Sequence, residues 1–138
     1  MPVEQASSKP KPSAEWIAIV DDDEGIRRSL ARVFRFSGFI VRTYASAEAY
    51  LADARADIPG CLVLDVQLGG VTGFELQDRL VAEGKSPPII FITALDHVTS
   101  GELERRAGAS GYLRKPFGTS ELLEMVRQHV REPAAAEW

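Results

Sequence analysis

Short apolar runs alternate with segments of helical periodicity along most of the chain. In the first helical segment, apolar residues recur every three or four positions, which places Ile26, Leu30 and Phe34 on one face. The apolar runs are short and end in polar residues or glycine, as buried strands do. The predicted strands span residues 16–20, 39–43, 61–64, 89–92 and 112–114. The predicted helices span residues 24–37, 46–54, 74–83, 99–107 and 120–131.

This alternation predicts an α/β domain, in which helices cover both faces of a five-stranded parallel sheet. Parallel neighbours need crossover connections, which are right-handed and usually helical. The domain is expected to cover residues 15–131. Residues 1–14 are rich in Pro, Ser and Lys and are expected to form a flexible N-terminal segment. Residues 132–138 are expected to be a C-terminal tail or a truncated linker.

Composition narrows the classes of function. The 138 residues suit one domain, and a net charge of -4 with a pI near 5.2 argues against a surface that coats DNA or RNA. No stretch resembles a signal peptide or a membrane span, so a reducing cytoplasm is the expected compartment. Cys61 is the single cysteine, which excludes an internal disulfide, and it is interpreted as a small buried hydrophobe.

Residues able to carry chemistry follow the predicted strands, each at the point where a strand ends. Asp21 and Asp22 follow the first strand, Asp65 the third, Thr93 the fourth and Lys115 the fifth. In parallel sheets of this type, sites lie beyond the carboxyl ends of the strands. The five side chains are therefore expected at one edge of the sheet.

The acidic run after the first strand has two interpretations. One acid stabilises a helix N-terminus as a cap, and Asp23 with Glu24 suits that role. Several packed carboxylates repel one another, however, and a hard divalent cation held by Asp21 and Asp22 would remove that cost. Both interpretations stay open when the run is taken alone.

The other residues at this edge have a structural and a chemical interpretation each. Asp65 is either a turn former or, beside a cation, an aspartyl nucleophile that attacks phosphorus. Thr93 either caps the next helix or donates to a phosphoryl oxygen. Lys115 precedes Pro116, and a cis peptide there would aim the ammonium inward, whereas a surface lysine before a trans proline is the alternative.

Taken together, the segments VDDDE, LDVQLGGVTG, FITA and GASGYLRKPF resemble the receiver domain of two-component response regulators, over residues 16–131. Further segments, SAEAYL, GCLVLDV and FELQDRL, resemble the nitrogen-fixation branch of transcription regulators. The resemblance implies a CheY-like, flavodoxin-like (βα)5 doubly wound parallel sheet with strand order 2-1-3-4-5.

By position, the resemblance also implies a role for each residue at the edge. Asp65 would be the phospho-acceptor, and Lys115 the cation that pairs with the phosphoryl group. Thr93 and Tyr112 would form the switch, although a core-only role for Tyr112 is an alternative. The implied cofactor is Mg²⁺, for which Mn²⁺ would substitute. Its implied ligands are Asp21, Asp22, Asp65 and the main-chain oxygen of Gln67.

The implied function is phosphorelay signal transduction. A sensor histidine kinase or a phosphotransfer protein would donate the phosphoryl group, and a downstream effector domain or protein would read the switched surface. The resemblance further implies a homodimer through the fourth helix, fifth strand and fifth helix, without contact to nucleic acid or membrane. No turnover of an external substrate is expected, since a haloacid-dehalogenase-like phosphatase would need a second Asp where Gln67 stands.

Two departures from the family pattern keep a non-phosphorylated pseudo-receiver, acting as a protein-interaction module, open as an alternative. Gly69 stands where the family usually has proline, which gives the loop more backbone freedom. The segment 95–97 is also atypical, and His97 is interpreted as a loop histidine. Gln67 and Leu95 would flank the path of water to a phosphoryl group, so Leu95→His is expected to change the autodephosphorylation rate severalfold.

Overall fold

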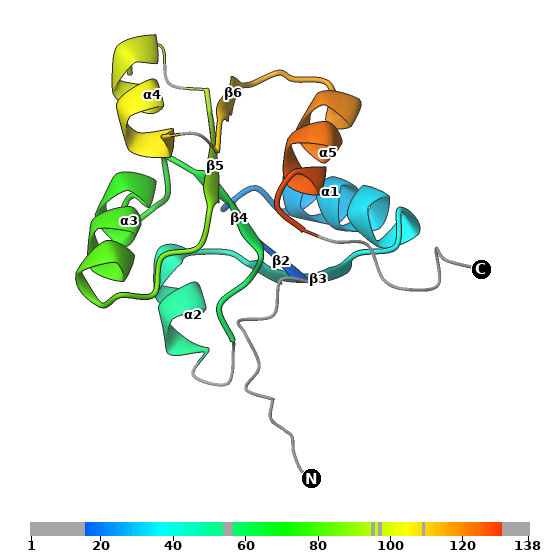
Figure 1. Ribbon diagram of the computed structural model, residues 1–138, viewed down its shortest axis with the longest axis horizontal. Coiled ribbons are helices and arrows are strands. Elements are labelled where there is room, and N and C mark those ends of the chain that lie inside the picture. Colours follow the sequence, from blue (N-terminus) through cyan, green and yellow to red (C-terminus); the bar gives the residue numbers. More distant parts are fainter. Residues whose placement is uncertain (1–15, 54–56, 95, 97, 109, 131–138) are drawn as a thin grey trace, which may run out of the picture.

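The computed structural model describes residues 16–53, 57–94, 96, 98–108 and 110–130. Figure 1 shows a central sheet between two layers of helices. The strands are β2 (Trp16–Val20), β3 (Ile40–Tyr44), β4 (Cys61–Asp65), β5 (Ile89–Thr93) and β6 (Tyr112–Arg114). The helices are α1 (Glu24–Phe36), α2 (Ala47–Ala52), α3 (Gly73–Ala82), α4 (Ser100–Ala107) and α5 (Thr119–Arg127).

Some of the sequence-based expectations fall outside these residues. They are the flexible N-terminal segment, the C-terminal tail, and the roles of Leu95 and His97. Within the described part of the chain, every helix is too short or too polar to cross a lipid bilayer.

All neighbouring strands pair in parallel, in the order β3-β2-β4-β5-β6. Helices α1 and α5 cover one face, and α2, α3 and α4 cover the other (Figure 1). The central strands β2, β4 and β5 are buried at every position, because they have a helical layer on each side and a strand at each edge. The predicted doubly wound sheet with strand order 2-1-3-4-5 is confirmed.

The end of α1 explains why the second strand begins one residue later than predicted. Gly38 has φ 100°, a left-handed conformation that glycine adopts without steric cost. The N–H of Gly38 donates to the carbonyl of Arg35, and the N–H of Phe39 donates to the carbonyl of Phe34, both at 3.0 Å. This turn occupies the main chain of Phe39, so β3 begins at Ile40.

The last helix is shorter than the predicted range 120–131. Helix α5 ends at Arg127, and the N–H of His129 then donates to the carbonyl of Val126 at 2.9 Å in a turn. The turn still carries an apolar residue back to the sheet. The buried residues of this segment are Leu122, Val126 and Val130, and its partly buried apolar residues are Leu123 and Met125.

Cys61 lies at the start of β4 and is fully buried, as the sequence indicated. Burial raises the pKa of its thiol to about 12, because the thiolate loses its hydration.

We expect a thiol-specific reagent at neutral pH to label Cys61 in the native protein at least about 100-fold more slowly than in the urea-unfolded protein, since labelling requires opening of the fold. With a reagent that releases a chromophore when it reacts, absorbance measures the labelling rates of the native and the unfolded protein. Comparable rates would contradict the burial of Cys61.

Candidate functional site

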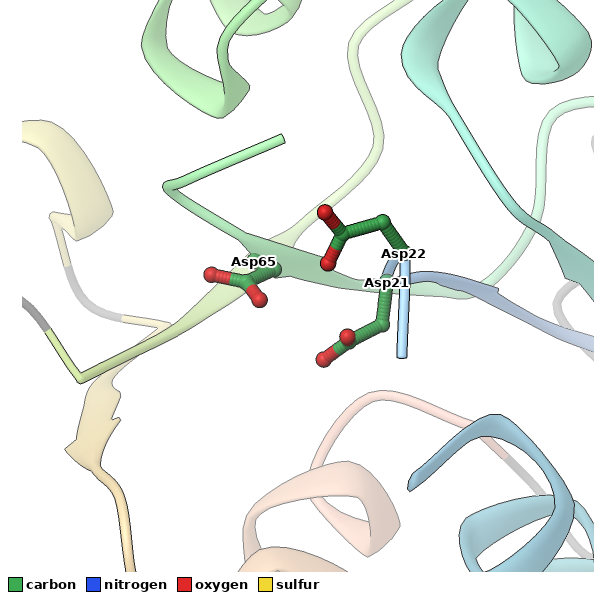
Figure 2. A group of neighbouring side chains, drawn as sticks. All are labelled: Asp21, Asp22 and Asp65. Atoms are coloured by element: carbon green, nitrogen blue, oxygen red, sulfur yellow. The ribbon is translucent and has the colours of Figure 1, made fainter. Parts of the chain in front are cut away.

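The carboxyl ends of the strands bring three acids together, as the sequence predicted. Asp21 and Asp22 follow β2, and Asp65 is the last residue of the neighbouring strand β4. Figure 2 shows the first two leaving the end of β2 beside Asp65. Each acid has a carboxylate oxygen within 4.8 Å of the others, and two of them, Asp21 and Asp65, are buried.

Lys115 reaches the same place from the end of β6. Its Nζ donates to Oδ2 of Asp65 at 2.8 Å and to Oδ2 of Asp21 at 3.1 Å. Its main-chain N–H donates to the carbonyl of Thr93 at 2.8 Å, which joins the end of β6 to the end of β5. The peptide bond from Lys115 to Pro116 is cis. One ammonium therefore faces two buried carboxylates.

Burial is the main reason why the pKa of Asp65 rises from 3.8 to about 6, and the charge of Asp21 raises it further. Hydrogen bonds from Lys115 and from the N–H of Gln67 oppose this rise. At pH 7 a group with such a pKa is about nine-tenths ionised. Burial also lowers the pKa of Lys115, but its bonds to the two carboxylates outweigh burial and raise it overall. The lysine therefore stays protonated.

A cavity of about 240 Å³ opens beside these groups. Its lining combines carboxylates with the loop that follows β4, and the described lining residues are Asp22, Asp23, Asp65, Gln67, Leu68, Gly69, Ala94 and Lys115. The acidic donors are all oxygens, which suits a hard divalent cation rather than a soft metal. Three carboxylates against one ammonium leave an excess of negative charge. The residues present therefore fit a divalent metal ion.

The capping role of the acidic run is divided differently from the prediction. Oδ1 of Asp23 accepts from the N–H of Ile26 at 3.1 Å, so Asp23 caps α1 as expected. Glu24 instead forms an exposed ion pair with Arg28 at 3.0 Å. Capping thus uses Asp23, whereas Asp22 lines the cavity and Asp21 accepts a hydrogen bond from Lys115. The capping interpretation is confirmed for Asp23, and the closeness of Asp21 and Asp22 to Asp65 fits the cation interpretation.

The two residues expected to form the switch lie on neighbouring strands. Thr93, the last residue of β5, is fully buried, and Tyr112, the first residue of β6, is half-buried against the core that α2, α3 and α4 cover. Tyr112 pairs in register with Phe91, two residues before Thr93. Thr93 thus ends its strand at the edge of the sheet where the acids lie, and Tyr112 lies on the neighbouring strand, opposite the residue two positions before Thr93.

Two residues that support the site carried no clear signal in the sequence. Arg27 of α1 donates from Nη1 to the main-chain oxygen of Asp21 at 2.8 Å, which fixes the turn that carries the acids. Gly73, the first residue of α3, packs directly on the end of β4. A Cβ atom there would lie 2.4 Å from the main-chain oxygen of Asp65. Arginine and glycine are common enough in helices and loops that spacing alone does not reveal these contacts.

Comparison with known proteins places this geometry in a family. Residues 17–127 match the model of the response regulator receiver domain. Nodulation protein W of Bradyrhizobium diazoefficiens is 38% identical over 110 residues, which cover 80% of this chain and 48% of that protein. The chain thus spans about half the length of this relative.

Two solved structures are similar as well. FixJ-N is 33% identical, with a TM-score of 0.71, over 82% of this chain and 90% of that one. Response regulator protein TrrA from Thermotoga maritima, solved in complex with Mg²⁺-BeF, is 27% identical, with a TM-score of 0.72, over 84% of this chain and 99% of that one.

The chain belongs to the response regulator receiver family of two-component signal transduction. Its relatives include regulators of the nitrogen-fixation branch, as the sequence suggested. It is a CheY-like receiver domain with an acidic pocket of Asp21, Asp22 and Asp65 beside Lys115, consistent with acceptance of a phosphoryl group. Such a domain accepts a phosphoryl group on itself and is not a conventional enzyme. Domains of this family act as partners of histidine kinases.

Proposed function

We propose that Asp65 is the phospho-acceptor of this receiver domain and that a sensor histidine kinase, or a phosphotransfer protein, is the donor. In the transfer, a carboxylate oxygen of Asp65 forms a bond to phosphorus while the bond from phosphorus to the donor imidazole breaks. The single observation that carries the proposal is the buried Asp65 carboxylate, which lies between Lys115 and the two acids that follow β2. The cytoplasm is the compartment proposed for this exchange.

The proposed cofactor is Mg²⁺, with Mn²⁺ as a substitute. Asp21, Asp22, Asp65 and the main-chain oxygen of Gln67 would hold it, and it would supply neutralisation of charge on the phosphoryl oxygens. The all-oxygen donor set supports this choice, and so does the Mg²⁺-BeF complex of the similar protein TrrA. Lys115 would shift its hydrogen bond from the Asp65 carboxylate to a phosphoryl oxygen, because charge-assisted bonds to phosphate are strong.

The proposed readout passes through Thr93 and Tyr112. New phosphoryl oxygens at the sheet edge would attract the Thr93 hydroxyl, and the space that it leaves would admit the ring of Tyr112. This would alter the surface of α4, β6 and α5, which is the proposed contact for an effector domain or protein and for a homodimer. A pseudo-receiver that binds partners without phosphorylation is the alternative, favoured by the glycine at position 69, where the family usually has proline, and by the atypical segment 95–97.

Intact mass spectrometry after incubation with acetyl phosphate and Mg²⁺ tests the proposal. We expect wild type to gain the mass of one phosphoryl group, and we expect chelation of Mg²⁺ to prevent the gain. Asp65→Asn should gain nothing, whereas Asp57→Asn, which changes an exposed acid away from the site, should behave as wild type. A wild type that gains no phosphoryl group would favour the pseudo-receiver, and an Asp65→Asn variant that gains one equally would show that Asp65 is not the acceptor.

A further inference from the structure

The loop between β4 and α3 forms one wall of the acidic cavity. Gln67, Leu68 and Gly69 line that cavity, so the position of the loop sets the shape of the site. The two ends of the loop are well anchored. The N–H of Val66 donates to the carbonyl of Ile92 at 3.0 Å, and the capping box of α3 fixes the other end at Thr72.

In the middle of the loop, residues 69–71, the partly buried side chain of Val71 packs against the core, but the two glycines add no side-chain packing. Two consecutive glycines give it more backbone freedom to lose than any other pair of residues would. Both glycines are exposed, and no described atom lies within 4 Å of the place where a Cβ of Gly69 would be. An additional contact is therefore needed to keep this arc in one position beside the site.

Glu48, in the first turn of α2, supplies such a contact. Its Oε2 accepts from the main-chain N–H of Val71 at 3.2 Å, across a separation of 23 residues. Hydrogen bonds from its own N–H and from the N–H of Val71 lower the pKa of Glu48, and the charge of Arg79 adds to this. The carboxylate is therefore ionised at neutral pH, and its bond to Val71 is charge-assisted.

Gly70 leaves the space that this carboxylate occupies. A Cβ atom on Gly70 would lie 2.6 Å from Oε2 of Glu48, which is too close for any real contact. The atom that it would meet is the far end of a flexible side chain, and the φ of Gly70 lies outside the left-handed region. Gly70→Ala would therefore push the carboxylate away from the loop without unfolding the domain.

We propose that Glu48 is a positioning residue of the phosphorylation site, which holds the Gly69-Gly70 arc in the place where the family usually relies on a proline. The inference rests on the proposed function, because the site that the arc lines is the proposed metal and phosphoryl site. Glu48 touches neither the metal nor the phosphoryl group. It acts through the loop that carries Gln67.

The test compares two variants that break the same contact from opposite sides, Glu48→Ala, which removes the acceptor, and Gly70→Ala, together with the double variant. Calorimetric titration measures the affinity for Mg²⁺, and hydrogen exchange measures protection of the Val71 amide. We expect each single variant to weaken Mg²⁺ binding about fivefold, less than the ~10-fold or more typical of groups bonded directly to a metal ligand. The Val71 amide should exchange faster in both, while the thermal midpoint changes little.

Two controls make the result specific. Both substitutions remove the same contact, so their effects on Mg²⁺ affinity should not add. The double variant should therefore have the same affinity for Mg²⁺ as the single variant with the lower affinity. Glu121→Gln removes another exposed acid from the first turn of a helix, α5, and should leave Mg²⁺ affinity unchanged. This control separates the loop contact from the general effect of an acid on the helix dipole.

The outcomes separate this inference from the proposed function. Normal Mg²⁺ affinity in Glu48→Ala, or fully additive effects in the double variant, would overturn the role of Glu48 while a phosphorylated wild type upholds Asp65. Wild type and variants could instead show the expected differences in Mg²⁺ affinity while wild type gains no phosphoryl group. That result would uphold the role of Glu48 in shaping the metal site and overturn the proposed phosphorylation. Failure of wild type to bind Mg²⁺ would overturn both.

Discussion

Gly73→Ala is expected to lower the free energy of unfolding by about 3 kcal/mol, the upper part of the range for overpacking a buried position. The added Cβ would lie 2.4 Å from the main-chain oxygen of Asp65 and 2.9 Å from Cα of Val66. Both are backbone atoms at the end of a central strand, so neither can rotate aside. Either α3 or the end of β4 must shift, and the second shift would also displace the carboxylate of Asp65. Urea denaturation monitored by circular dichroism measures the loss.

Gly69→Ala is the matched control, because it makes the same substitution in the same loop. No described atom lies within 4 Å of its Cβ position, and its φ lies outside the left-handed region. Alanine there should stabilise the domain by about 0.5 kcal/mol, since it reduces the freedom of the unfolded chain. Equal urea midpoints for the two variants would show that α3 moves away from β4 more easily than the packing indicates.

The contrast between these two glycines shows what the sequence could and could not predict. As letters, Gly69 and Gly73 are equivalent loop residues near a helix start. The structure separates them, because only Gly73 lies against the main chain of a neighbouring strand. Such a contact depends on how α3 is placed over the sheet, which no local pattern of residues encodes. Gly73 ends the segment LDVQLGGVTG that carries the family resemblance, but the resemblance gives no physical reason for a glycine there.

The fold itself was largely predictable, because local signals and global topology agree. Apolar runs with no polar interruption predicted the three central strands, and Ser46 and Thr99 stand where α2 and α4 are capped. The errors lie at the ends of elements. Phe39 was assigned to a strand from its apolar side chain, although a turn uses its main chain. The hydrophobic periodicity of a sequence reflects its side chains, whereas the end of a helix depends on backbone hydrogen bonds.

The site was predictable for a topological reason. Parallel strands end at the same edge, so residues far apart in the sequence must meet once the order of the strands is known. This brought Asp21, Asp65 and Lys115 within hydrogen-bonding distance. Contacts from helices were not predictable in this way. Glu48 and Arg27 reach the site from turns of α2 and α1, and their reach depends on helix placement and side-chain rotamer.

Lys115→Met is expected to lower the free energy of unfolding by about 2 kcal/mol in the absence of divalent cations. The methionine keeps an aliphatic chain of similar shape but removes the ammonium that bonds to Asp65 and Asp21. A charge-assisted bond contributes about 1.5–3 kcal/mol. Since the lysine side chain is 18% exposed, water screens part of this energy, and we expect a total loss within the range for a single unscreened bond. Denaturation in the presence of a chelator measures the loss.

Saturating Mg²⁺ should restore most of this stability, and that response distinguishes charge from packing. In the variant, the acids would no longer share their oxygens with an ammonium, so they should bind the cation more tightly and gain more from it. Lys85→Met is the matched control, because Lys85 lies 3.8 Å from Glu83 in an exposed pair and should cost less than about 0.5 kcal/mol with or without Mg²⁺. If Lys115→Met lost the same free energy under both conditions, the aliphatic chain of Lys115 would matter more than its charge. A loss confined to the metal-free protein would instead show that lysine and metal compensate the same carboxylates, so that the cation frees Lys115 to bond to a phosphoryl group.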